Sequence, residues 1–184
     1  MNIRYPEIGV CGLSCRLCPM YQTETASKCA GCKSSARMQV GCPFITCAVK
    51  NKGVEFCWEC SENETCEKWG KHREAGRHHD SFKCYQRLED DLALIRQKGI
   101  NEFDRQQKLR ERLLKKMLVN FNDGRSKSYY CIAATVFSIE KLQENLTLAR
   151  AQSEGFPLKN KAKVLHSILD SVAKDKGYLL KLRK

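Results

Sequence analysis

Residues 11–66 read CGLSCRLCPMYQTETASKCAGCKSSARMQVGCPFITCAVKNKGVEFCWECSENETC, and this stretch decides how the chain folds. It holds ten of the twelve cysteines in the 184-residue sequence. The cysteines come as closely spaced pairs, which is typical of a chain that folds around metal ions rather than around a large apolar core. We therefore expect an N-terminal module that is held together by metal.

Part of this stretch is too polar to fold by burial alone. From Gln22 to Arg37 there is no large aliphatic or aromatic side chain. Such a segment cannot offset its loss of conformational entropy by burying apolar surface. Zinc binding contributes about 10–16 kcal/mol to a small metal-dependent fold, which equals or exceeds the stability of about 5–15 kcal/mol of a whole domain. A bound metal can therefore order this segment.

The strongest motif is a pair of C-x2-C turns separated by ten residues. In each turn two thiolates can grip one tetrahedral ion, and Gly31 supplies the backbone freedom that such a turn often needs. Four cysteines that act only as small buried apolar residues are the competing interpretation, but this spacing in a polar stretch argues against it. We predict one zinc ion bound by Cys15, Cys18, Cys29 and Cys32.

A second group of cysteines follows, with apolar residues between its members. We predict that it binds a second zinc ion through Cys42, Cys47, Cys57 and Cys60. The C-x4-C spacing is a looser grip than C-x2-C, so Cys66 can replace any of the four. The candidate metal ligands are therefore all ten cysteines of the stretch: Cys11, Cys15, Cys18, Cys29, Cys32, Cys42, Cys47, Cys57, Cys60 and Cys66.

Two cysteines of the stretch are left over when two four-cysteine sites are filled. These are Cys11 and Cys66, and a reactive or metal-transfer role for such an unligated thiol stays open. His72, His78 and His79 can also complete a third site with Cys66. Solvated histidines in a polar linker are the favoured interpretation of those three residues.

The first ten residues contain no continuous apolar run of the length that a signal peptide needs, and no run in the chain approaches a membrane span. We therefore expect a cytoplasmic protein with no membrane association. Thiols stay reduced in the cytoplasm, so clustered cysteines favour metal ligation over disulfides.

An iron–sulfur cluster is the alternative to zinc, because thiolates hold both and spacing rarely separates them. Cys11, Cys15 and Cys18 also have the C-x3-C-x2-C spacing of radical enzymes that bind S-adenosylmethionine on a three-cysteine cluster. Those enzymes need alternating strands and helices after the motif, whereas further cysteines and then helices follow here.

The cysteine pattern also resembles a known family. The elements CGLSCRLCP, CAGC, the C-x4-C pair at Cys42 and Cys47, and KGVEFCWEC before Cys66 are similar to the cysteine-rich family catalogued as domain of unknown function 3795. The resemblance covers residues 11–66, and Thr65 stands where that family has Pro before its last cysteine. The resemblance implies a metal-binding module and does not indicate any particular activity.

The formal charge of the chain is +12, and most of it lies outside the cysteine-rich part. The net charge is +3 up to Cys84 and +9 from Tyr85 onward. A positive field of this kind favours encounters with an acidic macromolecule, either protein or nucleic acid, without choosing between them.

We divide the chain into a cysteine-rich module with its linker, 1–84, and a basic helical domain, 85–184. Before the cysteines, 3–10 is expected to be a short edge strand, and 68–81 a linker or a short irregular helix. After Tyr85 the apolar residues recur at helical spacing. Glycines at 99 and 177 are expected to end helices.

Further boundaries are expected within the helical domain. Asn101 is expected to cap a helix, the segment 129–146 to be helical with a break near Ser138, and the last helix to start at Leu158. The C-terminal residues 178–184 are expected to form a closing strand or to fray. The predicted fold is mainly α: a small irregular cysteine-rich metal-binding module followed by a basic bundle of about four helices.

One candidate site lies outside the cysteines. A turn at 122–124 precedes a helix that Ser126 or Ser128 can cap, which places Arg125 and Lys127 beside free backbone N–H groups. Arg125, Ser126, Lys127 and Ser128 are therefore a candidate anion-binding site, although a plain capped helix with exposed basic residues is the favoured interpretation.

No motif in the sequence indicates a particular reaction. There is no Gly-rich nucleotide loop, no H-E-x-x-H pair and no arrangement of Ser, His and Asp that can be argued from four histidines. We therefore expect a structural-zinc adaptor or binding module rather than an enzyme.

Overall fold

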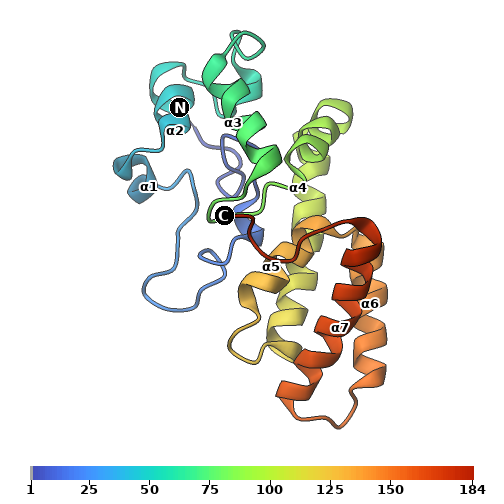
Figure 1. Cartoon of the computed structure of the whole chain (residues 1–184). Helices are drawn as coiled ribbons and strands as arrows, with labels where there is room; N and C mark the ends of the chain where they lie inside the picture. Colours follow the sequence, from blue (N-terminus) through green and yellow to red (C-terminus); the bar gives the residue numbers. More distant parts are fainter. Residues whose placement is uncertain (1) are drawn as a thin grey trace.

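The computed structural model describes residues 2–184 and is mainly α-helical, as the sequence predicts (Figure 1). A cysteine-rich region of short elements precedes five longer helices, α3 to α7. The elements in chain order are η1 Cys15–Leu17, α1 Ser35–Val40, α2 Pro43–Ile45, η2 Thr46–Asn51, η3 Cys57–Glu59, α3 Glu67–His78, α4 Leu88–Phe121, α5 Lys127–Val136, α6 Ile139–Gln152 and α7 Leu158–Lys176. Of the three η elements, η2 is a π-helix and the other two are 3-10 helices.

The cysteine-rich region is built from single turns of helix joined by loops. Ser34 caps α1 by accepting a hydrogen bond from the backbone N–H of Arg37, and Gly41 ends it in the left-handed conformation with φ of 80°. The expected strand over 3–10 is wrong. Within residues 2–184 the only β-type pairing is an isolated bridge between Ile8 and Ser14, because the chain turns back at once into the first cysteines.

Helix α3 corrects a second expectation. The segment predicted as a linker or short irregular helix is a regular helix of 12 residues. Its stability comes from packing, because the buried side chain of Trp69 joins Leu88 and Leu92 of α4 in one apolar cluster. Gly76 is needed at the far end, where an added Cβ would lie 3.1 Å from the ring of Tyr85.

Helix α4 is the longest element, and it is interrupted at the glycine that the sequence marks as a stop. Gly99 has φ of 81° and ψ of 164°, which are not helical values, and helix resumes at Ile100. Two helical segments therefore meet at this kink. The side chain of Asn101, expected to be a cap, accepts a hydrogen bond from the Tyr5 hydroxyl.

Helices α4, α5, α6 and α7 enclose the main apolar core (Figure 1). Helix α5 is its central element, because nearly all of its side chains after Tyr129 are buried. Ser138 separates α5 from α6 and caps α6 by accepting from the backbone N–H of Lys141 at 3.2 Å. Gly177 ends α7 with φ of 68°. These boundaries confirm the predicted break near Ser138 and the predicted stop at Gly177.

The two regions pack against each other instead of being joined only by a linker. Leu17 of η1 and Cys84, which precedes α4, are both buried in the apolar core of the helical bundle. The C-terminal tail runs back to the end of α3, so the C-terminus lies where the two regions meet (Figure 1). There the Arg183 guanidinium donates to the carboxylate of Asp80 at 3.3 Å. The tail forms no strand and is anchored by this contact.

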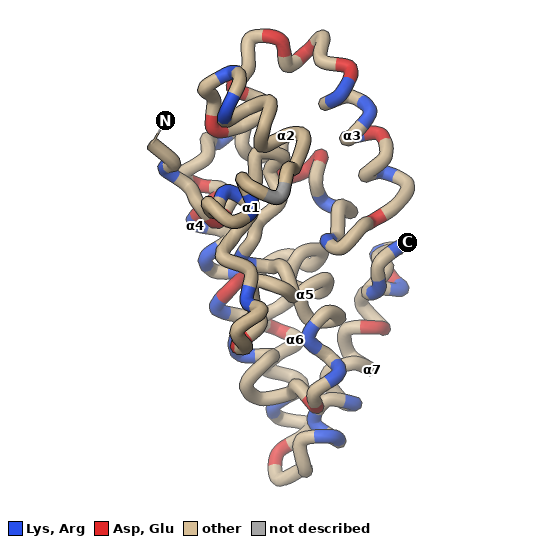
Figure 2. The backbone as a smooth tube through the Cα atoms, turned by 90° about the vertical axis from the view of Figure 1, so that its left-hand side faces the viewer, with Lys and Arg blue, Asp and Glu red and all other residues tan. Residues whose placement is uncertain are grey.

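Basic and acidic residues are both distributed along the whole chain, as Figure 2 shows. On α4, Lys108 pairs with Asp104 at 2.6 Å and Lys115 pairs with Glu111 at 3.1 Å. Much of the positive charge of this helix is therefore neutralised within the helix itself.

Among residues 2–184, no helix combines the length and the hydropathy required to span a bilayer.

Candidate metal centre

Six of the ten clustered cysteines line one cavity of about 220 Å³. The rest of its wall is mostly apolar or aromatic, with Val10, Tyr21 and Phe44 among its residues. The exposed side chains of Met20 and Phe82 also line it. The six cysteines of this first group are Cys11, Cys15, Cys18, Cys29, Cys32 and Cys42.

Tight turns present the thiols of the first group. The backbone N–H of Cys18 donates to the carbonyl of Cys15 at 3.0 Å, which closes the first C-x2-C turn. In the second turn, Gly31 has φ of 105°, a value that side chains rarely allow. The N–H of Cys32 then donates to Sγ of Cys15 at 3.2 Å. The two C-x2-C turns therefore meet face to face, as the spacing predicts.

A buried lysine lies beside these sulfurs. Nζ of Lys83 is 3.7 Å from Sγ of Cys15 and 3.6 Å from Sγ of Cys32. Only 6% of Lys83 is exposed. Sequence reasoning missed this residue, because nothing around it in the sequence marks it as different from the other lysines.

The electrostatics of the first group follow from this contact. A hydrogen bond with Cys15, with further help from the ammonium of Lys83, lowers the pKa of Cys32 to about 5. The shared proton, together with burial, raises the pKa of Cys15. Burial also raises the pKa of Cys11. Of the two coupled sulfurs, Cys32 therefore gives up its proton more readily than Cys15.

The remaining four cysteines line a second, smaller cavity of about 30 Å³. This second group consists of Cys47, Cys57, Cys60 and Cys66. Cys47 lies in η2, Cys57 begins η3, and Cys66 immediately precedes α3. Phe44 and Trp69 also line this cavity.

The second group differs by one member from the set that spacing favours. Cys42 lines the first cavity, and Cys66 joins the second group in its place. The reason is the path of the chain, because Pro43 starts a new helical turn after Cys42 and carries Cys47 to the other side. Burial, followed by the neighbouring thiols of Cys11, Cys47, Cys66 and Cys60, raises the pKa of Cys57 to about 12.

The donor chemistry fits a thiophilic metal. All twelve cysteines are free thiols, so none of the ten clustered sulfurs is consumed by a disulfide. In the part of the chain that the structure describes, no three Cys, His, Asp or Glu side chains have converged to the geometry of a closed metal site. Each of the two groups of thiols lines its own cavity. The cysteine side chains would have to rotate to bring their sulfurs around one ion.

The three histidines considered beside Cys66 are placed differently from one another. His72 lines the first cavity and packs between the rings of Phe44 and Tyr85, with centroid distances of 4.4 and 5.4 Å. Its Nε2 atom is buried without a hydrogen-bond partner, and burial lowers its pKa. His78 pairs with Glu74 on the surface, and His79 is exposed. The structure does not bring the three histidines together around Cys66.

The residues predicted to bind an anion are largely engaged within the protein. The Ser126 hydroxyl donates to the carboxylate of Asp123 at 2.8 Å, and that carboxylate also accepts from the backbone N–H of Arg125. Nζ of Lys127 donates to the Thr23 hydroxyl at 2.8 Å. Ser128, the fourth residue of the set, lines a small cavity beneath η1. Two of the four side chains, those of Ser126 and Lys127, are therefore engaged within the protein.

Comparison with known proteins identifies one family. The family described as "protein of unknown function (DUF3795)" matches residues 7–71, which include all ten clustered cysteines and most of α3. This match confirms the resemblance that the cysteine pattern indicates. No curated protein and no solved structure matches the chain at a significant level.

Proposed function

We propose that the cysteine-rich region, whose residues 7–71 match the DUF3795 family, is a metal-binding module that holds two zinc ions. The observation that carries the proposal is the division of ten free thiols between two separate cavities. Thiolate sulfur is a preferred ligand of zinc, and four sulfurs complete a tetrahedral structural site. Zinc would then order a region whose longest α-helix before α3 has six residues.

The two centres would use different parts of the cysteine stretch. Cys47, Cys57, Cys60 and Cys66 form a complete four-thiolate set, and their cavity of about 30 Å³ has the size of a single ion rather than of a cluster. Cys15, Cys18, Cys29 and Cys32 form the other set. Bound zinc supplies charge neutralisation and cross-linking at each set, while the protein supplies the turns that present the sulfurs.

Metal and sulfide analysis of protein purified without oxygen tests this proposal. We expect two zinc ions per chain and no acid-labile sulfide. Cys60→Ser should reduce the zinc content to one ion, since it removes one ligand of the second group. The matched control is Cys131→Ser, because Cys131 is buried in the helical core and lines neither cavity, so its loss should leave two ions bound. Protein that binds no metal would refute the proposal.

An iron–sulfur cluster in the first cavity is the second candidate function. The specific observation in its favour is size, because a cavity of about 220 Å³ lined by six cysteines is larger than one zinc ion requires. The same analysis separates the two, since a cluster gives iron, equimolar sulfide and a brown colour. This candidate implies electron transfer or a cluster-dependent reaction.

We also propose that the helical domain recognises an acidic macromolecule, which would make the chain a zinc-dependent adaptor in the cytoplasm. Exposed lysines of α7 support this better than Lys108 and Lys115 of α4 do, because those two pair with acids on the same helix. The lysines of α7 concerned are Lys159 and Lys163. Binding to nucleic acid should weaken steeply with added salt, in proportion to the phosphates neutralised. Binding that is insensitive to salt would exclude this partner.

A further inference from the structure

We infer that Lys83 is a positioning residue of the first metal centre, where its buried ammonium donates N–H···S hydrogen bonds to Cys15 and Cys32 and balances their negative charge. The inference rests on the proposed function, because it names a residue outside the cysteines that sets the charge and affinity of that centre. It also implies that the centre is anionic, as a four-thiolate zinc site is.

The geometry around Lys83 is unusual for a buried lysine. Its Nζ atom lies between two sulfurs, 3.7 Å from Cys15 and 3.6 Å from Cys32. None of the ion pairs found within residues 2–184 includes Lys83. Asp80, the acidic residue nearest in sequence, is engaged by Arg183 and by the backbone N–H of Tyr85. The sulfurs are therefore the counter-charge that the structure provides.

Lys33 shows how the same protein treats a buried lysine that has a structural role. Nζ of Lys33 is 2.6 Å from the carboxylate of Glu55 and lies 4.0 Å from the centroid of the Phe56 ring. Glu55 is buried as well and also accepts hydrogen bonds from two backbone N–H groups. Lys33 thus has a carboxylate partner inside the protein, whereas Lys83 has only thiols.

Burial makes this contrast informative. Removing an ammonium group from water costs several kcal/mol unless a negative charge compensates it. A neutral thiol is a weak acceptor and gives little compensation, but a metal-bound thiolate keeps most of a negative charge. The position of Lys83 is therefore best satisfied when Cys15 and Cys32 are ligands of an anionic centre.

The place of Lys83 in the chain also suits a positioning role. It lies between α3 and α4, after Phe82, which lines the cavity, and before Cys84, which is buried in the bundle core. The backbone on its C-terminal side is thus anchored in the helical domain. The side chain of Lys83 therefore extends from the helical domain and places its ammonium beside the sulfurs of Cys32 and Cys15, which are 51 and 68 residues away in the sequence.

Metal affinity measured on the full chain tests the inference. Metal-free protein is titrated with Zn²⁺ against a chromophoric chelator, which resolves the affinities of the two centres. Loss of an outer-shell partner typically lowers metal affinity 10–100-fold. We expect Lys83→Met to weaken one of the two affinities by about this factor and to leave the other unchanged. Lys83→Arg, which keeps the charge and the donors, should restore most of the affinity.

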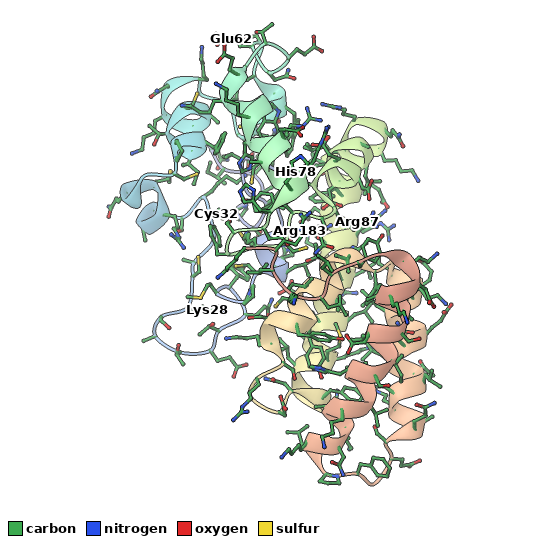
Figure 3. The ribbon with its side chains drawn as sticks, viewed as in Figure 1. Lys28, Cys32, Glu62, His78, Arg87 and Arg183 are labelled. Atoms are coloured by element: carbon green, nitrogen blue, oxygen red, sulfur yellow. The ribbon has the colours of Figure 1, made fainter. Side chains whose placement is uncertain are left out.

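The matched control is Lys28→Met, because Lys28 is exposed on the loop that leads to Cys32 (Figure 3). This control should not change either affinity. A second readout is the rate at which iodoacetamide alkylates the zinc-loaded protein, since N–H···S hydrogen bonds reduce the nucleophilicity of a thiolate. We expect faster alkylation in Lys83→Met than in the control.

Each result has a defined meaning. Lys83→Gln provides a neutral donor and replaces Lys83→Met if circular dichroism shows that the latter is unfolded. If both neutral variants fold and bind two zinc ions as tightly as the unmodified protein, the inference is wrong and the metal-binding proposal stands. If the unmodified protein binds no zinc, the metal-binding proposal fails and the inference fails with it.

Discussion

The cysteine-rich region and the helical bundle are stabilised by different means, although they share one chain and one interface. One apolar cluster of 19 buried residues contains 17 residues of the bundle together with Leu17 and Cys84. The cysteine-rich region contributes instead to three small clusters of three or four buried side chains each, two of which are completed by side chains of α4. Short elements that bury little apolar surface need another source of stability. We propose that bound metal provides it in the cysteine-rich region.

Of the changes proposed here, removal of the metal should have the largest effect on the difference between the two regions. Chelation under reducing conditions should remove about 10 kcal/mol or more of binding free energy from the cysteine-rich region. We expect amide hydrogen exchange to become fast over residues 11–66 and to stay slow in α5, α6 and α7. Unchanged protection over residues 11–66 would mean that this region orders itself without metal.

A substitution in the apolar core of the bundle should destabilise the helical region and leave the metal centres unchanged. Leu165 is fully buried in α7, so Leu165→Ala should lower the free energy of unfolding by about 2–5 kcal/mol through the cavity that it leaves. Denaturant unfolding measures the change, and metal content should not alter. The control is Leu158→Ala in the same helix, where 46% of the side chain is exposed. Equal losses in the two variants would contradict the assigned core.

A half-buried carboxylate at the interface, that of Asp91, gives a pH-dependent test. Burial raises the pKa of Asp91 to about 7, with Arg110 and Arg87 opposing the shift. The folded-state pKa therefore lies above the unfolded value of about 3.9. The protonated form favours folding, and that contribution is lost as the pH rises through about 7.

Asp91→Asn is neutral at every pH and should escape this loss. Relative to the unmodified protein, its free energy of unfolding should rise by about 2–3 kcal/mol between about pH 4 and pH 8, less than the full shift because Arg110 loses a neighbouring charge. Denaturant unfolding at both pH values measures the difference. Asp90→Asn, at the adjacent exposed position, is the control. A relative stability that falls with pH would contradict the assignment.

The smallest effect concerns the tail that bridges the two regions. Arg183→Ala removes hydrogen bonds to Asp80 and to the carbonyls of Gly76 and Arg77, and we expect a loss of about 1–2 kcal/mol. Thermal unfolding and proteolysis of the C-terminal residues measure the loss, with Lys181→Ala at an exposed position as the control. A tail that stays resistant to protease in Arg183→Ala would show that the contact is not its anchor.

Much of the helical half could be predicted from local sequence. The stops at Gly99 and Gly177 and the break at Ser138 depend on backbone conformations and caps that involve only a few neighbouring residues. Two predictions failed for a tertiary reason. Residues 67–78 form a regular helix because Trp69 packs on α4, and 3–10 finds no neighbouring strand with which to pair.

The sequence by itself determined that six of the ten clustered cysteines would be presented in tight turns, because the spacing within each of the three C-x2-C units is local. Only the tertiary structure decided that Cys42 lines the first cavity, that Cys66 completes the second group, and that Lys83 lies against two sulfurs. These contacts join residues that are far apart in the sequence. They depend on how α3, α4 and the bundle direct the chain, and no local spacing encodes that path.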